Sequence, residues 1–176
     1  MEADDGKPGP AAARRDLDLV CRVLDRLAAA GAPCLLAGGW GEELLGLRAA
    51  GPHGDIDLLL PAPSFAAVDA VLAGGARDAA EIAAKRFAHK RAFRHGDVMV
   101  EVTLVEPGPG GPVTRFWADV PFRWLTPLAC RVVLPERRRA VEVLTAANLA
   151  HYRAHHRETQ PWRWRDPAMR IARPGE

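Results

Sequence analysis

The sequence predicts an α/β (α+β) fold in which helices flank a mixed β-sheet and a further helix lies near the C-terminus. Three observations predict it. Apolar residues recur at helical spacing over residues 16–27, and short apolar runs at residues 34–37 and 55–60 enclose a second helical stretch. Residues 98–106 form the most strand-like run of the chain. Strands that alternate with helices across short loops are typical of this class.

The first half of the chain begins with residues 1–13, which are rich in Pro, Gly and Ala and are predicted to be a disordered tail. The helix that starts at residue 16 is expected to end at Gly31. A strand over residues 34–37 and a helix over residues 40–49 follow.

The middle of the chain is predicted to be mainly strand. Pro61 ends the strand over residues 55–60, and Ser64 is expected to cap a helix that runs to Leu72. Alternating residues before a Gly-Asp turn at residues 96–97 indicate that a hairpin leads into the strand at residues 98–106.

The last third is predicted to be less regular. Residues 115–124 and 130–134 are expected to add edge strands or an irregular wall, and residues 135–139 to form an exposed basic turn. Thr145 is expected to cap a helix over residues 146–157. The predicted organisation is therefore one domain over residues 14–159, followed by a tail rich in Trp and Arg over residues 160–176.

Composition excludes several classes of function. The 176-residue chain carries a formal net charge of only +2, so it is not a globally basic nucleic-acid binder. Its three cysteines are odd in number and widely spaced, which argues against a disulfide framework or a zinc knuckle. Neither a signal peptide nor a membrane span is recognisable, so we expect a cytoplasmic protein without membrane partners.

The most informative polar residues are Asp55 and Asp57. Side chains two positions apart on a strand point the same way, so both carboxylates are expected on one face of the sheet. Adjacent acids of this kind suit Mg²⁺, which proteins usually hold with one or two carboxylates plus substrate phosphates. Gly38 and Gly39, just before a predicted helix, allow backbone N–H groups to approach a phosphate.

Glu101 is a third candidate carboxylate, in the middle of the apolar run at residues 98–106. Burying an unpaired charge costs free energy, so the presence of a carboxylate in this apolar run requires an explanation. Either it faces solvent or pairs with an arginine such as Arg91, or it belongs to the metal site. Glu106 is the reserve candidate.

These motifs resemble a known family. The chain reads Gly-Gly-Trp at residues 38–40 and His-Gly-Asp-Ile-Asp at residues 53–57, with Glu43 three positions after the Trp. This pattern resembles nucleotidyltransferases of the DNA polymerase beta superfamily, in particular the small enzymes that adenylylate aminoglycosides or lincosamides. Gly51 stands where that pattern has Arg, and Leu47 where it has Gly.

The resemblance implies a nucleotidyltransferase fold and an activity. An enzyme of this kind uses Mg²⁺ and an NTP, here ATP, to transfer a nucleoside monophosphate to a hydroxyl of a small molecule, with release of pyrophosphate. Asp55, Asp57 and Glu101 would be the metal ligands and catalytic residues. The nucleotide would be bound by Gly38, Gly39 and His53, with Arg91 (or its neighbour Lys90) neutralising phosphate charge.

Two other functions stay open at the level of sequence. The Gly at position 51 favours a binding or regulatory protein that keeps the fold without catalysis, and an enzyme that modifies a protein or RNA is the third possibility. His151 and His155 lie one helical turn apart, as in a two-histidine metal site, but a solvated helix face is favoured because no third ligand is near in the sequence.

Overall fold

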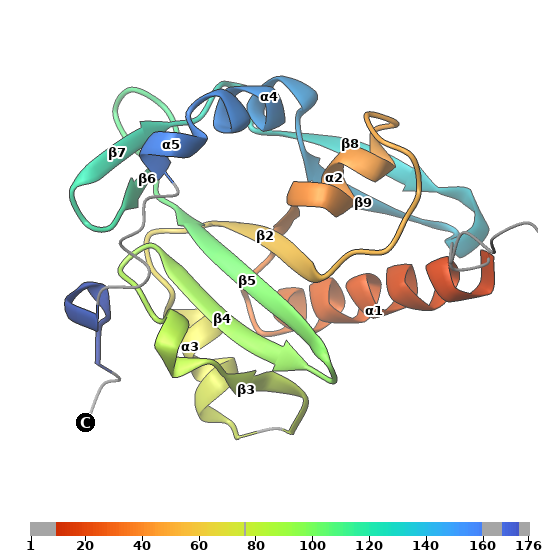
Figure 1. Ribbon diagram of the computed structural model, residues 1–176, viewed down its shortest axis with the longest axis horizontal. Helices are drawn as coiled ribbons and strands as arrows, with labels where there is room; N and C mark the ends of the chain where they lie inside the picture. Colours follow the sequence, from red (N-terminus) through yellow and green to blue (C-terminus); the bar gives the residue numbers. More distant parts are fainter. Residues whose placement is uncertain (1–9, 76, 160–166, 173–176) are drawn as a thin grey trace, which may run out of the picture.

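The computed structural model describes residues 10–75, 77–159 and 167–172. A mixed sheet runs through this part of the molecule (Figure 1). Its strands are β1 (Leu35–Leu36), β2 (Asp55–Pro61), β3 (Ala80–Glu81), β4 (Lys90–His95), β5 (Val98–Val105), β8 (Ala129–Leu134) and β9 (Arg139–Leu144), in the spatial order β3-β4-β5-β2-β1-β9-β8. Because β2 is parallel to β5 and antiparallel to β1, the predicted mixed sheet is confirmed.

Helices and a separate hairpin cover the sheet. The helices are α1 (Pro10–Ala29), α2 (Gly38–Leu44), α3 (Ala66–Ala73), α4 (Ala146–Ala154) and α5 (His156–Thr159), and the hairpin joins β6 (Val113–Phe116) to β7 (Val120–Arg123). Short 3-10 turns are η1 (Arg77–Ala79), η2 (Ala83–Lys85), η3 (Pro135–Arg137) and η5 (Pro167–Met169). In Figure 1, α1 and α3 lie on one side of the sheet, while α4, α5 and the β6–β7 hairpin lie on the other.

Two apolar cores follow from the two-residue repeat of the strands. Ile56, Leu58 and Leu60 of β2 point into the core formed with α1 and α3. Leu59 points the other way, into a core shared with the β6–β7 hairpin and α4. Asp55 and Asp57 have the parity of Leu59, so the fold puts both acids on the face that α4 and the hairpin overhang.

Several predicted bounds differ from the structure. The first helix begins at Pro10, six residues earlier than predicted, and α2 already starts at the Gly-Gly pair and ends at Leu44. The predicted C-terminal helix is broken at His155 into α4 and α5. Strand β9 was not predicted, although it pairs in parallel with β1 inside the sheet. Thr145 caps α4 as expected, its side chain accepting a hydrogen bond from the Asn148 N–H.

Both predicted tails lie largely outside the described residues, which omit residues 1–9, 160–166 and 173–176. The division into tails and one domain stays a prediction. Across the helices that are described, none combines the length and apolarity needed to cross a bilayer. Cys21, Cys34 and Cys130 are free thiols, and burial raises the pKa of Cys34 to about 12, which does not favour thiol chemistry there.

Asn148 anchors α4 to the chain that follows β7. Its fully buried amide accepts a hydrogen bond from the Leu125 N–H (2.7 Å) and donates to the carbonyls of Leu125 and Pro127, both at 3.1 Å. This one side chain satisfies several backbone groups that would otherwise lack partners, and it fixes the position of the helix that overhangs Asp57.

We expect Asn148→Ala to lower the free energy of unfolding by about 2–4 kcal/mol, because it leaves buried backbone groups unsatisfied. Urea denaturation measures this loss. Ala147→Gln, at an exposed position of the same helix, is the control and should change stability by less than about 0.5 kcal/mol. A loss below about 1 kcal/mol for the Asn148 variant would mean that these groups find other partners.

Candidate active site

A cavity of about 340 Å³ opens between the sheet, α2 and α4. Asp57 and Glu101 are paired neighbours on the parallel strands β2 and β5, and both line the cavity. The structure thus brings together the two acids that the sequence placed on separate runs. Asp55 shares their face by strand parity but stands at the start of β2, outside the cavity lining.

Gly38 makes room for the Asp57 carboxylate. It adopts a φ of +56°, and a Cβ added there would overlap the carboxylate oxygen Oδ2. A side chain at this position is therefore excluded twice, by backbone conformation and by space. The backbone N–H groups at the start of α2 have no carbonyl acceptor within the helix, so they are available to a ligand near Asp57.

The charge of Asp57 is unfavourable in the free protein. Burial, followed by the nearby charges of Asp55 and Glu101, raises the pKa of Asp57 to about 7 from its usual 3.8. Lys90 and Lys85 oppose this rise without cancelling it. A carboxylate with so high a pKa marks a site that either binds a proton or needs a cation.

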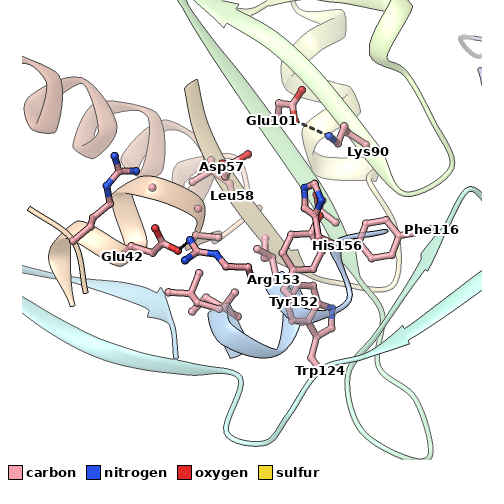
Figure 2. Close-up of a pocket in the computed structure, with 18 residues that line it drawn as sticks. Glu42, Asp57, Leu58, Lys90, Glu101, Phe116, Trp124, Tyr152, Arg153 and His156 are labelled. Atoms are coloured by element: carbon pink, nitrogen blue, oxygen red, sulfur yellow. Dashed lines mark hydrogen bonds and ion pairs between the residues drawn. The ribbon is translucent and has the colours of Figure 1, made fainter. Parts of the chain in front are cut away.

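Glu101 already has cationic partners. Lys90 Nζ lies 2.6 Å from Glu101 Oε2 (Figure 2), and Lys85 Nζ contacts Oε1. Burial raises the pKa of this carboxyl, but the two lysines outweigh burial and hold the pKa below its usual value. Glu101 therefore stays ionised near neutral pH.

Behind Gly39, His53 and Glu43 form a supporting pair. His53 Nε2 lies 2.7 Å from Glu43 Oε2, and the imidazole packs on the Trp40 ring with centroids 4.2 Å apart. The same carboxylate oxygen accepts a hydrogen bond from the Gly51 N–H (3.1 Å). His53 thus ties the loop before β2 to α2, and a Cβ on Gly39 would come within 2.7 Å of its Nδ1.

Arg48 is a site residue that the sequence prediction missed. It lines the cavity, and its Nη1 would lie 2.9 Å from a Cβ placed on Gly39. An arginine therefore stands beside the Gly-Gly turn although position 51 carries none. Because Arg48 belongs to the irregular loop after α2, no periodicity in the sequence marks it; the only available signal was its closeness to the motif.

Arg91 is not part of this site. Its guanidinium donates to Asp69 Oδ1 (2.7 Å) and to the Phe87 carbonyl (2.7 Å), and it stacks 4.2 Å above the Phe65 ring on the α3 side of the sheet. The expectation that Arg91 meets the phosphates or Glu101 is therefore wrong.

The register of the β4–β5 hairpin explains this error. A two-residue turn pairs His95 with Val98, which places Ala92 opposite Glu101. Lys90 then shares the face of Glu101, whereas Arg91 faces the other way. The Gly-Asp turn in the sequence was enough to choose between Lys90 and Arg91.

The cavity residues fit a divalent cation in part. Asp57 and Asp55 supply hard oxygen donors. Burial and then the charge of Asp55 raise the pKa of Asp57, and a bound cation would lower it again. Within residues 10–75, 77–159 and 167–172, no group of three or more His, Cys, Asp or Glu side chains is placed to hold a metal. Glu101 is paired with lysines instead, so its role as a third ligand stays a prediction.

Aromatic residues form the opposite wall of the cavity. Phe116, Trp124 and Tyr152 lie together there, with the Trp124 and Tyr152 rings 5.5 Å apart (Figure 2). His151 and His155 are packing residues: the ring of each lies within 6 Å of the Phe122 ring, and His151 Nε2 contacts the Arg123 carbonyl at 3.1 Å.

Comparison with known proteins gives structural relatives only. No protein-family model matches the sequence, and no curated protein matches it. The antibiotic-resistance factor ANT(2'')-Ia superposes with a TM-score of 0.60 at 14% identity, over 84% of this chain and 75% of the other.

Two further solved structures are similar. The lincosamide antibiotic adenylyltransferase LnuA, bound to lincomycin, gives a TM-score of 0.59 at 12% identity over 76% of this chain and 82% of the other. A proposed nucleotidyltransferase from Thermotoga maritima gives 0.55 at 13% identity, over 84% and 86% of the two chains. At these identities the likeness concerns the fold alone. The chain has the nucleotidyltransferase fold that its motifs predict.

Proposed function

We propose that this protein is a Mg²⁺-dependent nucleotidyltransferase that moves AMP from ATP to a hydroxyl of a small molecule and releases pyrophosphate. The observation that carries the proposal is the arrangement around Asp57. A buried carboxylate with a raised pKa lies against Gly38, beside Glu101, in a cavity large enough for a ligand. Relatives by fold include adenylyltransferases, which supports this reading.

The phosphate end of the nucleotide is assigned to the Gly-Gly turn. Backbone N–H groups of Gly38 and Gly39 are free of side chains that would block a phosphate, and Arg48 stands beside them with a fixed positive charge. Asp57 and Asp55 would hold Mg²⁺ there, which would neutralise charge on the phosphates and on the oxygens of the reacting centre. His53 orients this loop from behind through its bond to Glu43.

Glu101 is assigned to the acceptor. The hydroxyl oxygen forms a bond to the α-phosphorus, the bond between that phosphorus and the bridging oxygen breaks, and pyrophosphate leaves. The hydroxyl proton passes to Glu101. A carboxylate that two lysines hold is a weak base, so Lys90 must release Glu101 Oε2 first. The triphosphate attracts Lys90, which lines the same cavity as the Gly-Gly turn, and thereby frees that oxygen.

Antibiotics are the acceptors to test first. ANT(2'')-Ia has been solved with adenylyl-2''-tobramycin, and LnuA with lincomycin. Both fold relatives thus point to hydroxyl-bearing antibiotics as the class of small molecule for this site.

Calorimetry with ATP, GTP, CTP and UTP, with and without Mg²⁺, tests nucleotide binding, and transfer of labelled AMP to tobramycin or lincomycin tests the reaction. We expect Mg²⁺-dependent binding that favours ATP. Failure of folded protein to bind any of the four nucleotides would contradict the proposal.

Arg48→Ala should raise the dissociation constant for Mg²⁺-ATP about tenfold, because it removes a charge-assisted contact to phosphate. Arg94→Ala is the matched control. That arginine is exposed on β4 and contacts the Asp97 carbonyl at 3.3 Å, outside the cavity lining. Equal affinities in the two variants would remove Arg48 from the nucleotide site.

One observation favours a second candidate function. The ion pairs that occupy both Glu101 oxygens would also suit a protein that binds nucleotide without transferring it. Such a protein would bind Mg²⁺-ATP in calorimetry, yet Glu101→Gln would leave that affinity unchanged and no acceptor would become labelled.

A further inference from the structure

A second cavity of about 170 Å³ lies on the other side of the Glu101–Lys90 pair. It shares Lys90, Glu101 and Phe116 with the first cavity. Its remaining described lining residues are Lys85, Phe87, His89, Trp117 and Thr159. Since the Gly-Gly turn and Arg48 lie in the first cavity, the second cavity is on the side of Glu101 that faces away from the phosphates.

Trp117, one of the residues that line the second cavity, carries an unused hydrogen-bond donor. Trp117 is only 7% exposed, and its indole Nε1 has no hydrogen-bond partner in the described part of the chain. The backbone N–H of Trp117 donates to His89 Nδ1 at 3.0 Å, so the ring proton of this neutral histidine is on Nε2. A buried donor without a partner is costly, and a ligand oxygen would remove that cost.

The charges in the two cavities do not suit a polycation. Glu42 is paired with Arg153, and Glu101 with Lys90 (Figure 2). Glu101 is also paired with Lys85. Of the acids that line the cavities, this leaves Asp57, which belongs to the nucleotide end. A ligand with several ammonium groups would meet two lysines and an arginine. The one carboxylate oxygen that the nucleotide frees, Glu101 Oε2, takes the hydroxyl proton and is not left to bind an ammonium group.

Flat apolar surface continues from one cavity to the other. The Phe116 ring borders both, 6.0 Å from the Tyr152 ring, and its neighbours on the second side are His89 and Phe87. The His89 and Phe87 rings stack almost in parallel, 9° apart in plane. Rings and aliphatic faces of a ligand pack well on such walls.

We propose that the acceptor is an uncharged or anionic hydroxyl compound with a flat apolar face, which lies along Phe116 and accepts a hydrogen bond from Trp117 Nε1. This inference rests on the proposed transferase function and narrows its substrate class. It separates the protein from enzymes whose acceptors are polyamines.

The test compares three probes on protein saturated with Mg²⁺ and α,β-methylene-ATP, which cannot transfer its AMP. The probes are para-nitrophenyl glucoside, lincomycin and tobramycin. We expect the uncharged aryl glycoside to bind at least about tenfold more tightly than the polyamine tobramycin. Tighter binding of tobramycin would overturn the inference, and so would the absence of glucoside binding while the nucleotide binds. Loss of nucleotide binding itself would instead overturn the proposed function.

Trp117→Phe removes the donor and keeps a ring. We expect the dissociation constant of the glucoside to rise about three- to tenfold while nucleotide affinity stays unchanged. Trp124→Phe is the comparison for stability, because that indole N–H already donates to Thr114 (2.9 Å). Both variants shrink a buried ring and should lower Tm, but Trp124→Phe should lower it further because it also breaks a hydrogen bond. Unchanged glucoside affinity in Trp117→Phe would overturn the role of this indole.

Discussion

Asp57→Asn should make the ligand-free protein more stable near neutral pH while it abolishes transfer. The folded state holds this carboxylate where burial and two neighbouring acids oppose its charge. A neutral amide of the same shape removes that opposition. We expect the free energy of unfolding to rise by about 2–4 kcal/mol at about pH 8, and activity to fall by about 10²–10⁴-fold because the cation loses a ligand.

The pKa of Asp57 determines how the stability of the wild type changes with pH. The pKa of Asp57 is about 7 when folded and has a usual value of 3.8, so the folded protein binds the proton more tightly than the unfolded chain. Wild-type stability should therefore fall as pH rises through this interval, and the loss is complete above it. The advantage of the Asn variant should vanish below about pH 3, where both states of the wild type are protonated.

Urea denaturation at several pH values, with and without Mg²⁺, checks the prediction. Mg²⁺ should stabilise the wild type at about pH 8 and leave the Asn variant unchanged. Asp97→Asn, in the exposed turn between β4 and β5, is the control and should not alter stability across this range. If the Asp57 variant proves less stable than the wild type at about pH 8, the carboxylate is stabilising and the site needs no cation.

The parts of the site that follow strand parity were predictable from sequence. Asp55 and Asp57 face the same way because they are two residues apart, and Glu101 meets Asp57 because the runs at residues 55–60 and 98–106 pair as neighbours. The Gly-Gly turn, although it starts α2 two residues earlier than expected, lies beside Asp57 as its motif implies.

The parts that were missed depend on contacts between distant segments. β9 pairs with β1 in parallel across more than a hundred residues, and its run carries Glu142 among the valines, so local pattern gave no reason to place it in the sheet. Lys85 reaches Glu101 from a 3-10 turn that has no strand or helix period. Side chains from irregular segments are set by tertiary packing, which is why the cations of the site were harder to predict than its acids.

Among the glycines of the described residues, Gly38 should be the one at which substitution by Ala is most damaging. The residue has a φ of +56°, and the new Cβ would overlap the Asp57 carboxylate. The backbone conformation alone costs about 1–2 kcal/mol, and crowding adds about 1–3 kcal/mol. The larger consequence is functional: a displacement of about 1 Å at Asp57 is enough to reduce transfer about 100-fold.

The Gly46→Ala variant separates the backbone cost from the crowding against Asp57. Gly46 has a φ of +70°, but a Cβ there would meet nothing within 4 Å. It should lose about 1–2 kcal/mol of stability and retain full nucleotide binding, because only the backbone cost applies. Urea denaturation and calorimetry with Mg²⁺-ATP on the two variants provide the comparison. If both variants bind ATP as the wild type does, Gly38 is needed only for the backbone conformation of the turn. The close approach of Asp57 to this glycine would then have no part in nucleotide binding.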